Sequence, residues 1–166
     1  MDIDILIKKG FENTPPAKAW LKKVVITALT SEHVSPSAQV SLLITSQEKV
    51  HELNRQYLDE DRPTDVLSFP MITPEETSTP TFVTPPDGVV HLGEVIISYP
   101  QAVIQAEEHG HSVDKEMAVL IIHGILHLLA YDHDVPEAEK KMKERETTIL
   151  GLIYDTLSRK GQSTCL

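Results

Sequence analysis

The sequence of 166 residues predicts a single α+β domain in which a sheet is covered by helices. Three observations lead to this prediction. Four short segments have the apolar pattern of β-strands, about five segments have apolar residues at helical spacing, and the strands come early in the chain while the longest helices come late. A chain of this length can bury a sizeable core as one domain.

The predicted strands are recognised by their apolar residues and by the residues that end them. In the first strand, Ile3, Ile5 and Ile7 alternate with other residues, which is the period of a strand. The third strand is closed by Pro70, which has no backbone N–H to donate to a sheet. The four predicted strands comprise residues 2–8, 40–44, 65–69 and 89–98.

The predicted helices are marked by residues that favour helix starts as well as by apolar spacing. Two prolines at residues 15–16 suit the first turn of the first helix, with Asn13 or Thr14 as its cap. Ser46 and Ser112 are the expected caps of two later helices. The five predicted helices comprise residues 15–30, 46–57, 100–110, 112–130 and 134–157.

Two segments lack any such pattern. Residues 71–88 are rich in proline and threonine and show no hydrophobic periodicity, so we expect a flexible loop inserted into the domain. The tail from about residue 158 is expected to fray, as chain ends commonly do. The domain prediction is therefore one unit over residues 1–166 with these two irregular parts.

Composition narrows the classes of function. The net charge of −10 disfavours broad electrostatic binding to nucleic acid, so any RNA contact requires a local basic patch or a protein partner. The single cysteine, Cys165, allows no intrachain disulfide and disfavours thiolate ligation of a metal. We find no signal-peptide pattern and no apolar run long enough for a membrane span, which predicts a cytoplasmic protein.

Three histidines give the clearest functional signal. His123, His127 and His133 follow one another at positions i, i+4 and i+10 in an apolar segment. The first two project from one face of a helix, one turn apart, and can bind one metal ion from the same side. His133 can join them only if the helix ends near Ala130 and the chain folds back. Three histidines with an open fourth position are typical of catalytic zinc.

The three histidines are also compatible with two other kinds of protein. Metalloproteases of the metzincin type share this spacing, but they carry a catalytic glutamate where this chain has Gly124, so peptide hydrolysis would lack its general base. A non-catalytic ribosome-assembly protein with structural zinc would need a fourth ligand, for which Asp132 or His111 is available. Glu116 cannot replace the missing glutamate of a protease. It lies about two helical turns before His123, too far for direct contact with a metal-bound water.

Four segments together resemble the YbeY family, the bacterial rRNA maturation factors regarded as zinc-dependent endoribonucleases. They read LNRQYLDEDRPTDVLSFP (residues 53–70), HLGEVIIS (91–98), QAEEHGHS (105–112) and HGILHLLAYDH (123–133). The resemblance extends over about residues 46–133. The histidine motif alone is fairly specific, and together with PTDVLSFP it becomes highly specific.

The resemblance implies a single α+β domain with a central four-stranded mixed sheet and one zinc ion per chain, held by His123, His127 and His133. It implies an endoribonuclease specific for single-stranded RNA, acting in 16S rRNA 3′-end maturation and ribosome quality control. The implied partners are the 16S rRNA precursor, the small ribosomal subunit or its proteins, and small GTPases. Neither a membrane nor DNA is an expected partner.

Three positions depart from the family pattern. Ala130 replaces a glycine, Glu94 replaces an aspartate, and Leu58 stands where the family often has an arginine that is considered important for activity. Arg55 and Arg62 are the nearby cations that we predict to contact RNA phosphates, although exposed arginines are common. The departure at Leu58 leaves the catalytic residues beyond the metal ligands unassigned.

Overall fold

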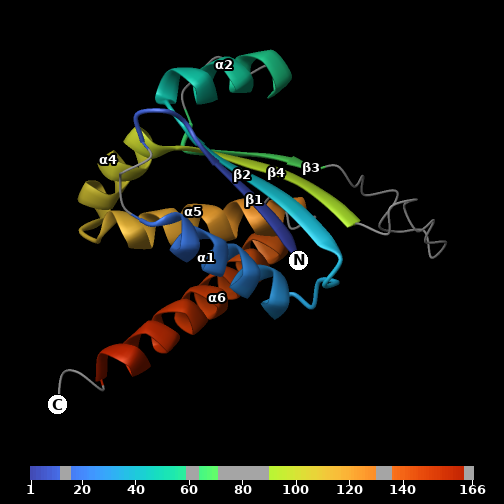
Figure 1. Cartoon of the computed structure of the whole chain (residues 1–166), viewed down its shortest axis with the longest axis vertical. Coiled ribbons are helices and arrows are strands. Elements are labelled where there is room, and N and C mark those ends of the chain that lie inside the picture. The colour runs from blue at the N-terminus through green and yellow to red at the C-terminus, as the bar shows by residue number, and fades with distance from the viewer. Residues whose placement is uncertain (12–15, 59–63, 71–89, 130–135, 163–166) are drawn as a thin grey trace.

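The computed structural model describes residues 1–11, 16–58, 64–70, 90–129 and 136–162, apart from the side chains of residues 58 and 155–162 (Figure 1). Within these ranges the chain forms one mixed sheet with helices on both faces (Figure 1). The predicted α+β architecture is therefore confirmed. The predicted loop at residues 71–88 lies outside the described residues.

The sheet has four strands in the order β1-β2-β4-β3. The pairs β1–β2 and β2–β4 are parallel, whereas β3 runs antiparallel to β4. Gln39 and Val40 are consecutive on β2 but pair with His91 and Gly93, so Leu92 is the extra residue of a bulge near the start of β4. The strands span Asp2–Ile7 (β1), Ala38–Thr45 (β2), Val66–Pro70 (β3) and Val90–Ser98 (β4).

The helices lie in unequal numbers on the two faces of the sheet. One face carries α2, while α5 lies against the other face with α1 and α6 packed around it (Figure 1). None of the described helices has the length and apolarity that crossing a membrane requires. The helices span Lys18–Ser31 (α1), Gln47–Leu58 (α2), Tyr99–His109 (α4), Val113–Leu128 (α5) and Pro136–Gln162 (α6).

The main core lies between the sheet and α5. Ten residues of α5 are buried, including Ile121, Ile122, Ile125 and Leu126, which are at most 1% exposed. Alternate residues of the inner strands and one stripe each of α1 and α6 complete this core. Burial of this many branched side chains supplies the main stabilisation of the fold, at roughly 1.5–3 kcal/mol for each large apolar side chain. The helix with two of the predicted ligands is thus anchored in the core over much of its length.

Helix ends follow the sequence prediction in part. Ser46 and Ser112 cap α2 and α5, since their hydroxyl oxygens accept the backbone N–H of Lys49 and Lys115. The first helix was expected to begin at residues 15–16, but it begins at Lys18 after an N-cap residue that offers no side-chain bond. Its predicted caps at residues 13–14 lie outside the described residues.

The last two helices also differ from their predicted lengths. α5 ends at Leu128, two residues before the predicted end, and its C-cap residue bonds back through its backbone N–H. α6 continues to Gln162, beyond the predicted end at residue 157 and into the part of the tail that was expected to fray. The described helix therefore includes residues 158–162.

Candidate metal centre

His123 and His127 lie next to each other on one face of α5. Their rings meet edge to face, with centroids 4.5 Å apart, and both side chains are partly exposed. The two Nε2 atoms are 2.9 Å apart. In such a contact one nitrogen donates its hydrogen to the lone pair of the other, and a metal ion bound by both nitrogens would take the place of that hydrogen. The helical spacing thus brings the two predicted ligands together as expected.

This geometry is close to the one that zinc requires. Zinc–nitrogen bonds of about 2.0–2.1 Å at a tetrahedral angle place two ligand nitrogens about 3.3 Å apart. The observed 2.9 Å separation between the Nε2 atoms needs only a small rotation of the rings to match. His133 lies outside the described residues, so the full set of three ligands stays a prediction.

The second ring nitrogen of His123 faces a carboxylate. Its Nδ1 lies 2.6 Å from Oε1 of Glu146, which comes from the neighbouring helix α6. His123 and Glu146 retain 35% and 24% side-chain exposure, so their contact lies at the protein surface but is partly shielded from water. A carboxylate on the far side of an imidazole is a common arrangement behind metal-binding histidines.

Gly124 faces the sheet and not the histidine pair. A Cβ atom at this position would lie 2.6 Å from Cγ1 of Val95 on β4, well inside contact distance. The backbone oxygen of Gly124 accepts a hydrogen bond of 3.0 Å from the hydroxyl of Ser68 on β3. The helix and the edge strand therefore approach so closely that no larger residue fits. A glutamate of the metalloprotease type has no room here and would not point at the metal.

We expect Gly124→Ala to lower the free energy of unfolding by about 1–3 kcal/mol because the added methyl group overpacks the contact with Val95. Gly151→Ala on α6 is the matched control, since nothing lies within 4 Å of the place that its methyl group would take and alanine is the better helix former by about 1 kcal/mol. Urea denaturation of both variants measures the difference. Equal stabilisation by both substitutions would contradict the close packing of α5 on the sheet.

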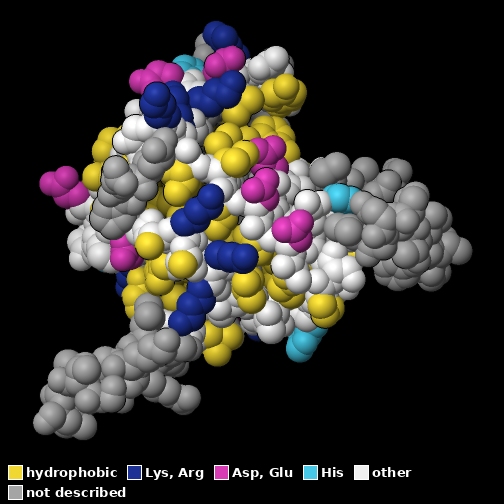
Figure 2. Space-filling model, in the orientation of Figure 1, with side chains coloured by type: hydrophobic (Ala, Val, Ile, Leu, Met, Phe, Trp, Pro, Cys, Tyr) yellow, Lys and Arg dark blue, Asp and Glu magenta, His cyan; other side chains and the backbone are white. Residues whose placement is uncertain are grey.

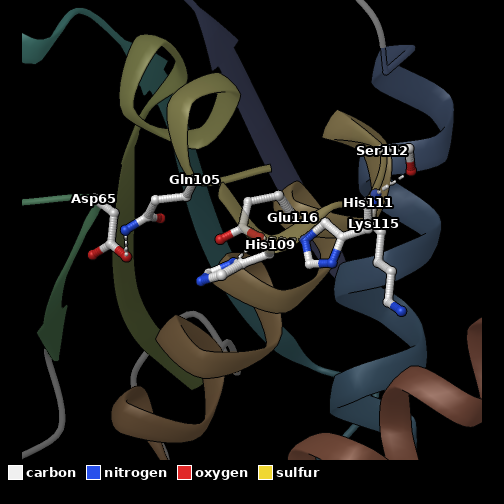
Figure 3. Close-up of polar contacts among 7 residues, drawn as sticks. All are labelled: Asp65, Gln105, His109, His111, Ser112, Lys115 and Glu116. Atoms are coloured by element: carbon white, nitrogen blue, oxygen red, sulfur yellow. Dashed lines mark hydrogen bonds and ion pairs between the residues drawn. The ribbon is translucent and has the colours of Figure 1, made fainter. Parts of the chain in front are cut away.

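A second group of metal-binding residue types lies at the turn between α4 and α5. His109, His111 and Glu116 each offer a ligand atom, and these atoms all lie within 4.8 Å of one another (Figure 3). This group can hold a metal ion. Sequence reasoning treated His111 and Glu116 separately and missed the group. Its members converge because Gly110 adopts the left-handed conformation that ends α4 and turns the chain into α5.

The members of this group are also joined by hydrogen bonds. Oε2 of Glu116 lies 2.5 Å from Nε2 of His111 and 3.1 Å from Nδ1 of His109. Glu116 is only 2% exposed and sits in the first turn of α5, where the helix dipole favours a negative charge. Two imidazole donors satisfy the same buried oxygen. Because His111 is engaged with Glu116, which precedes His123 by about two turns, the structure offers no support for His111 as a fourth ligand to His123 and His127.

A separate set of polar contacts holds Asp65, the residue directly before β3. Asp65 accepts the side-chain amide of Gln105 on α4 at 3.1 Å through Oδ2 (Figure 3). Its other carboxylate oxygen accepts the backbone N–H of Val66 at 2.8 Å. Its backbone oxygen accepts the N–H of Ser98 at 2.9 Å. Asp65 thus fixes the start of β3 to both α4 and β4.

Of the two arginines predicted to bind RNA, the one that the structure describes lies away from the histidines. Arg55 is exposed on α2, on the opposite face of the sheet from α5 (Figure 1). Arg62 lies outside the described residues. On the described part of the face drawn in Figure 2, Lys and Arg side chains lie among acidic and apolar ones and form no broad basic surface. RNA binding by Arg55 and Arg62 stays a prediction.

The sequence is similar to curated proteins from several bacteria, all with the name Endoribonuclease YbeY. One from Dehalococcoides mccartyi strain CBDB1 is 46% identical over 160 residues, covering 95% of this chain and 96% of the relative. One from Roseiflexus castenholzii is 43% identical over 142 residues, covering 85% of each chain. One from Brevibacillus brevis is 40% identical over 144 residues, covering 84% of this chain and 91% of the relative.

The fold also has a counterpart among solved structures. The solution structure of TM1509 from Thermotoga maritima is 28% identical in sequence and matches with a TM-score of 0.59, covering 95% of this chain and 93% of that chain. The family model described as Endoribonuclease YbeY matches residues 5–153 of this sequence. With nearly the whole chain matched both by this model and by relatives of 40–46% identity, the protein belongs to the YbeY family.

Proposed function

We propose that this chain is a metal-dependent endoribonuclease that cleaves single-stranded RNA, with a role in 16S rRNA 3′-end maturation and ribosome quality control. The observation that carries the proposal is the convergence of the His123 and His127 Nε2 atoms, 2.9 Å apart, on a buried helix. Relatives of up to 46% identity have the name Endoribonuclease YbeY, which supports RNA as the substrate.

The metal in this proposal is a single zinc ion held by His123, His127 and His133. A zinc ion with three neutral histidines supplies a strong Lewis acid and lowers the pKa of a bound water to about 7. Within the chain, His123 and His127 would hold and orient the ion from a helix that is buried against the sheet. The close packing at Gly124 keeps that helix pressed against β3 and β4.

The proposed partners are inferred from the RNA substrate and from the net charge of the chain. The substrate is the single-stranded part of the 16S rRNA precursor, reached in the cytoplasm on the small ribosomal subunit. A net charge of −10 gives the chain little long-range attraction for RNA, so we assign delivery to the small ribosomal subunit or one of its proteins. RNA affinity that depends neither on salt nor on such a partner would argue against this assignment.

A cleavage assay tests the proposal. We expect zinc-loaded protein to cut a single-stranded RNA oligonucleotide and to leave both a duplex of the same sequence and casein intact. Removal of zinc by a chelator should stop the cleavage of RNA, and addition of zinc should restore it. Gel analysis of end-labelled RNA measures the products. Cleavage of casein but not RNA would support a protease instead. If the protein cuts neither substrate but binds small ribosomal subunits, the non-catalytic assembly role is correct.

A further inference from the structure

Glu146 reaches the predicted metal centre from a different helix. It lies 23 residues after His123 in sequence, on α6, and its Oε1 is 2.6 Å from the His123 Nδ1. The same side of α6 carries Met142 and Ile149, which are 2% and 0% exposed and belong to the main core. Since these residues lie four before and three after Glu146, the core holds its carboxylate toward α5.

Arg145, the preceding residue, fixes the position of α6 along its axis. Its Nε donates to Oε1 of Glu32 at 2.6 Å. Its terminal nitrogen donates to the backbone oxygen and the hydroxyl of Ser31 at 3.3 Å and 2.8 Å. These contacts attach α6 to the C-terminal end of α1. Two consecutive residues of α6 therefore anchor it, one to α1 and one to the imidazole of His123.

The contact with Glu146 selects one tautomer of His123. A carboxylate accepts hydrogen bonds, so the His123 nitrogen that faces it carries the hydrogen. In a neutral imidazole, the hydrogen on Nδ1 leaves the lone pair on Nε2. Nε2 is the atom that faces Nε2 of His127. The helix-to-helix contact thus directs the metal-binding lone pair of His123 toward the second ligand.

We propose that Glu146 is a positioning residue for the metal centre, holding His123 as the Nδ1–H tautomer with its Nε2 aimed at the ion. This inference rests on the proposed metal site. Loss of such a carboxylate partner commonly lowers metal affinity by about 10–100-fold, because the ring loses both its fixed orientation and part of its basicity. Glu146 does not contact the ion itself, so metal binding is weakened without being abolished.

The test compares Glu146→Ala with Glu144→Ala, which removes an exposed carboxylate two residues earlier on the same helix. Competition of the full chain with a chromophoric chelator for Zn²⁺ alone measures affinity. We expect about a 10–100-fold loss for Glu146→Ala, no change for Glu144→Ala, and partial recovery for Glu146→Gln, whose amide oxygen still accepts the Nδ1–H. Thermal unfolding of each metal-free variant verifies that it is folded.

A second measurement reports on the tautomer directly. In metal-free wild-type protein, ¹⁵N chemical shifts of the His123 ring should show the hydrogen on Nδ1, and Glu146→Ala should shift the hydrogen toward Nε2. Unchanged zinc affinity and unchanged tautomer in Glu146→Ala would overturn the inference. If that result accompanies loss of zinc in His127→Ala, the proposed metal site stands without the role of Glu146. If His127→Ala retains zinc, the metal site itself is wrong.

Discussion

Replacing His127 with alanine is expected to remove the metal and the RNA-cleaving activity together. The substitution deletes one of two imidazoles whose Nε2 atoms converge at 2.9 Å, and one ligand fewer leaves the ion too weakly held to persist through purification. Because the loss of a mere supporting contact costs about 10–100-fold in affinity, loss of a ligand should cost more than about 100-fold. Elemental analysis and the cleavage assay measure the two effects.

The matched variant for this prediction is Glu116→Gln, at the second group of possible ligands. It replaces the carboxylate that both His109 and His111 contact with an amide of nearly the same shape. We expect it to retain about one zinc ion per chain and to cut RNA. If Glu116→Gln loses the metal while His127→Ala keeps it, the ion belongs to the turn between α4 and α5. Equal metal content in wild type and His127→Ala would refute the assignment to α5.

The second large effect is expected for Gly93→Ala, at the point where β3, β4 and α5 meet. Gly93 has φ of 136°, which alanine rarely adopts, and a Cβ atom there would lie 2.3 Å from the backbone oxygen of Phe69 and 3.0 Å from Cδ2 of Leu128. Strain of about 1–3 kcal/mol adds to overpacking of about 1–3 kcal/mol, so the free energy of unfolding should fall by about 2–6 kcal/mol. Urea denaturation measures it.

Gly10→Ala separates the two contributions to this prediction. Gly10 also has a positive φ, 105°, but nothing lies within 4 Å of its added methyl group. It should therefore show the backbone strain without the steric clash. If Gly93→Ala is no less stable than Gly10→Ala, the backbone of Phe69 must move aside to make room for the added methyl group. That result would contradict the steric clash expected at Gly93.

The strands and helices were predictable because their signals are local. Ser46 and Ser112 act as caps within three residues of the N–H groups that they accept, and the i, i+4 spacing of His123 and His127 is set by the helix alone. The start of α1 was misplaced because its N-cap, Ala17, offers no side-chain bond that a sequence could reveal. Local pattern therefore predicts an element well and its ends less well.

The features that were missed depend on chain geometry beyond one element. The group around Glu116 forms only because a left-handed Gly110 folds α5 back toward the end of α4. The contact of Glu146 with His123 requires α6 to dock on α5 in one particular register, which no periodicity encodes. The insertion of β4 between β2 and β3 is likewise a matter of topology. Local pattern thus pointed to the three histidines but not to the residues that support them.

The burial of α5 determines when the predicted ligands become ordered. Ten residues of this helix are buried against the sheet and its neighbouring helices, so the backbone that carries His123 and His127 is immobilised by folding itself. The backbone conformational entropy of these two residues is then lost before any ion arrives. In small zinc domains, by contrast, metal binding supplies the free energy of folding. In this chain the hydrophobic core would form the proposed metal site during folding, and an ion would bind to a protein that is already folded.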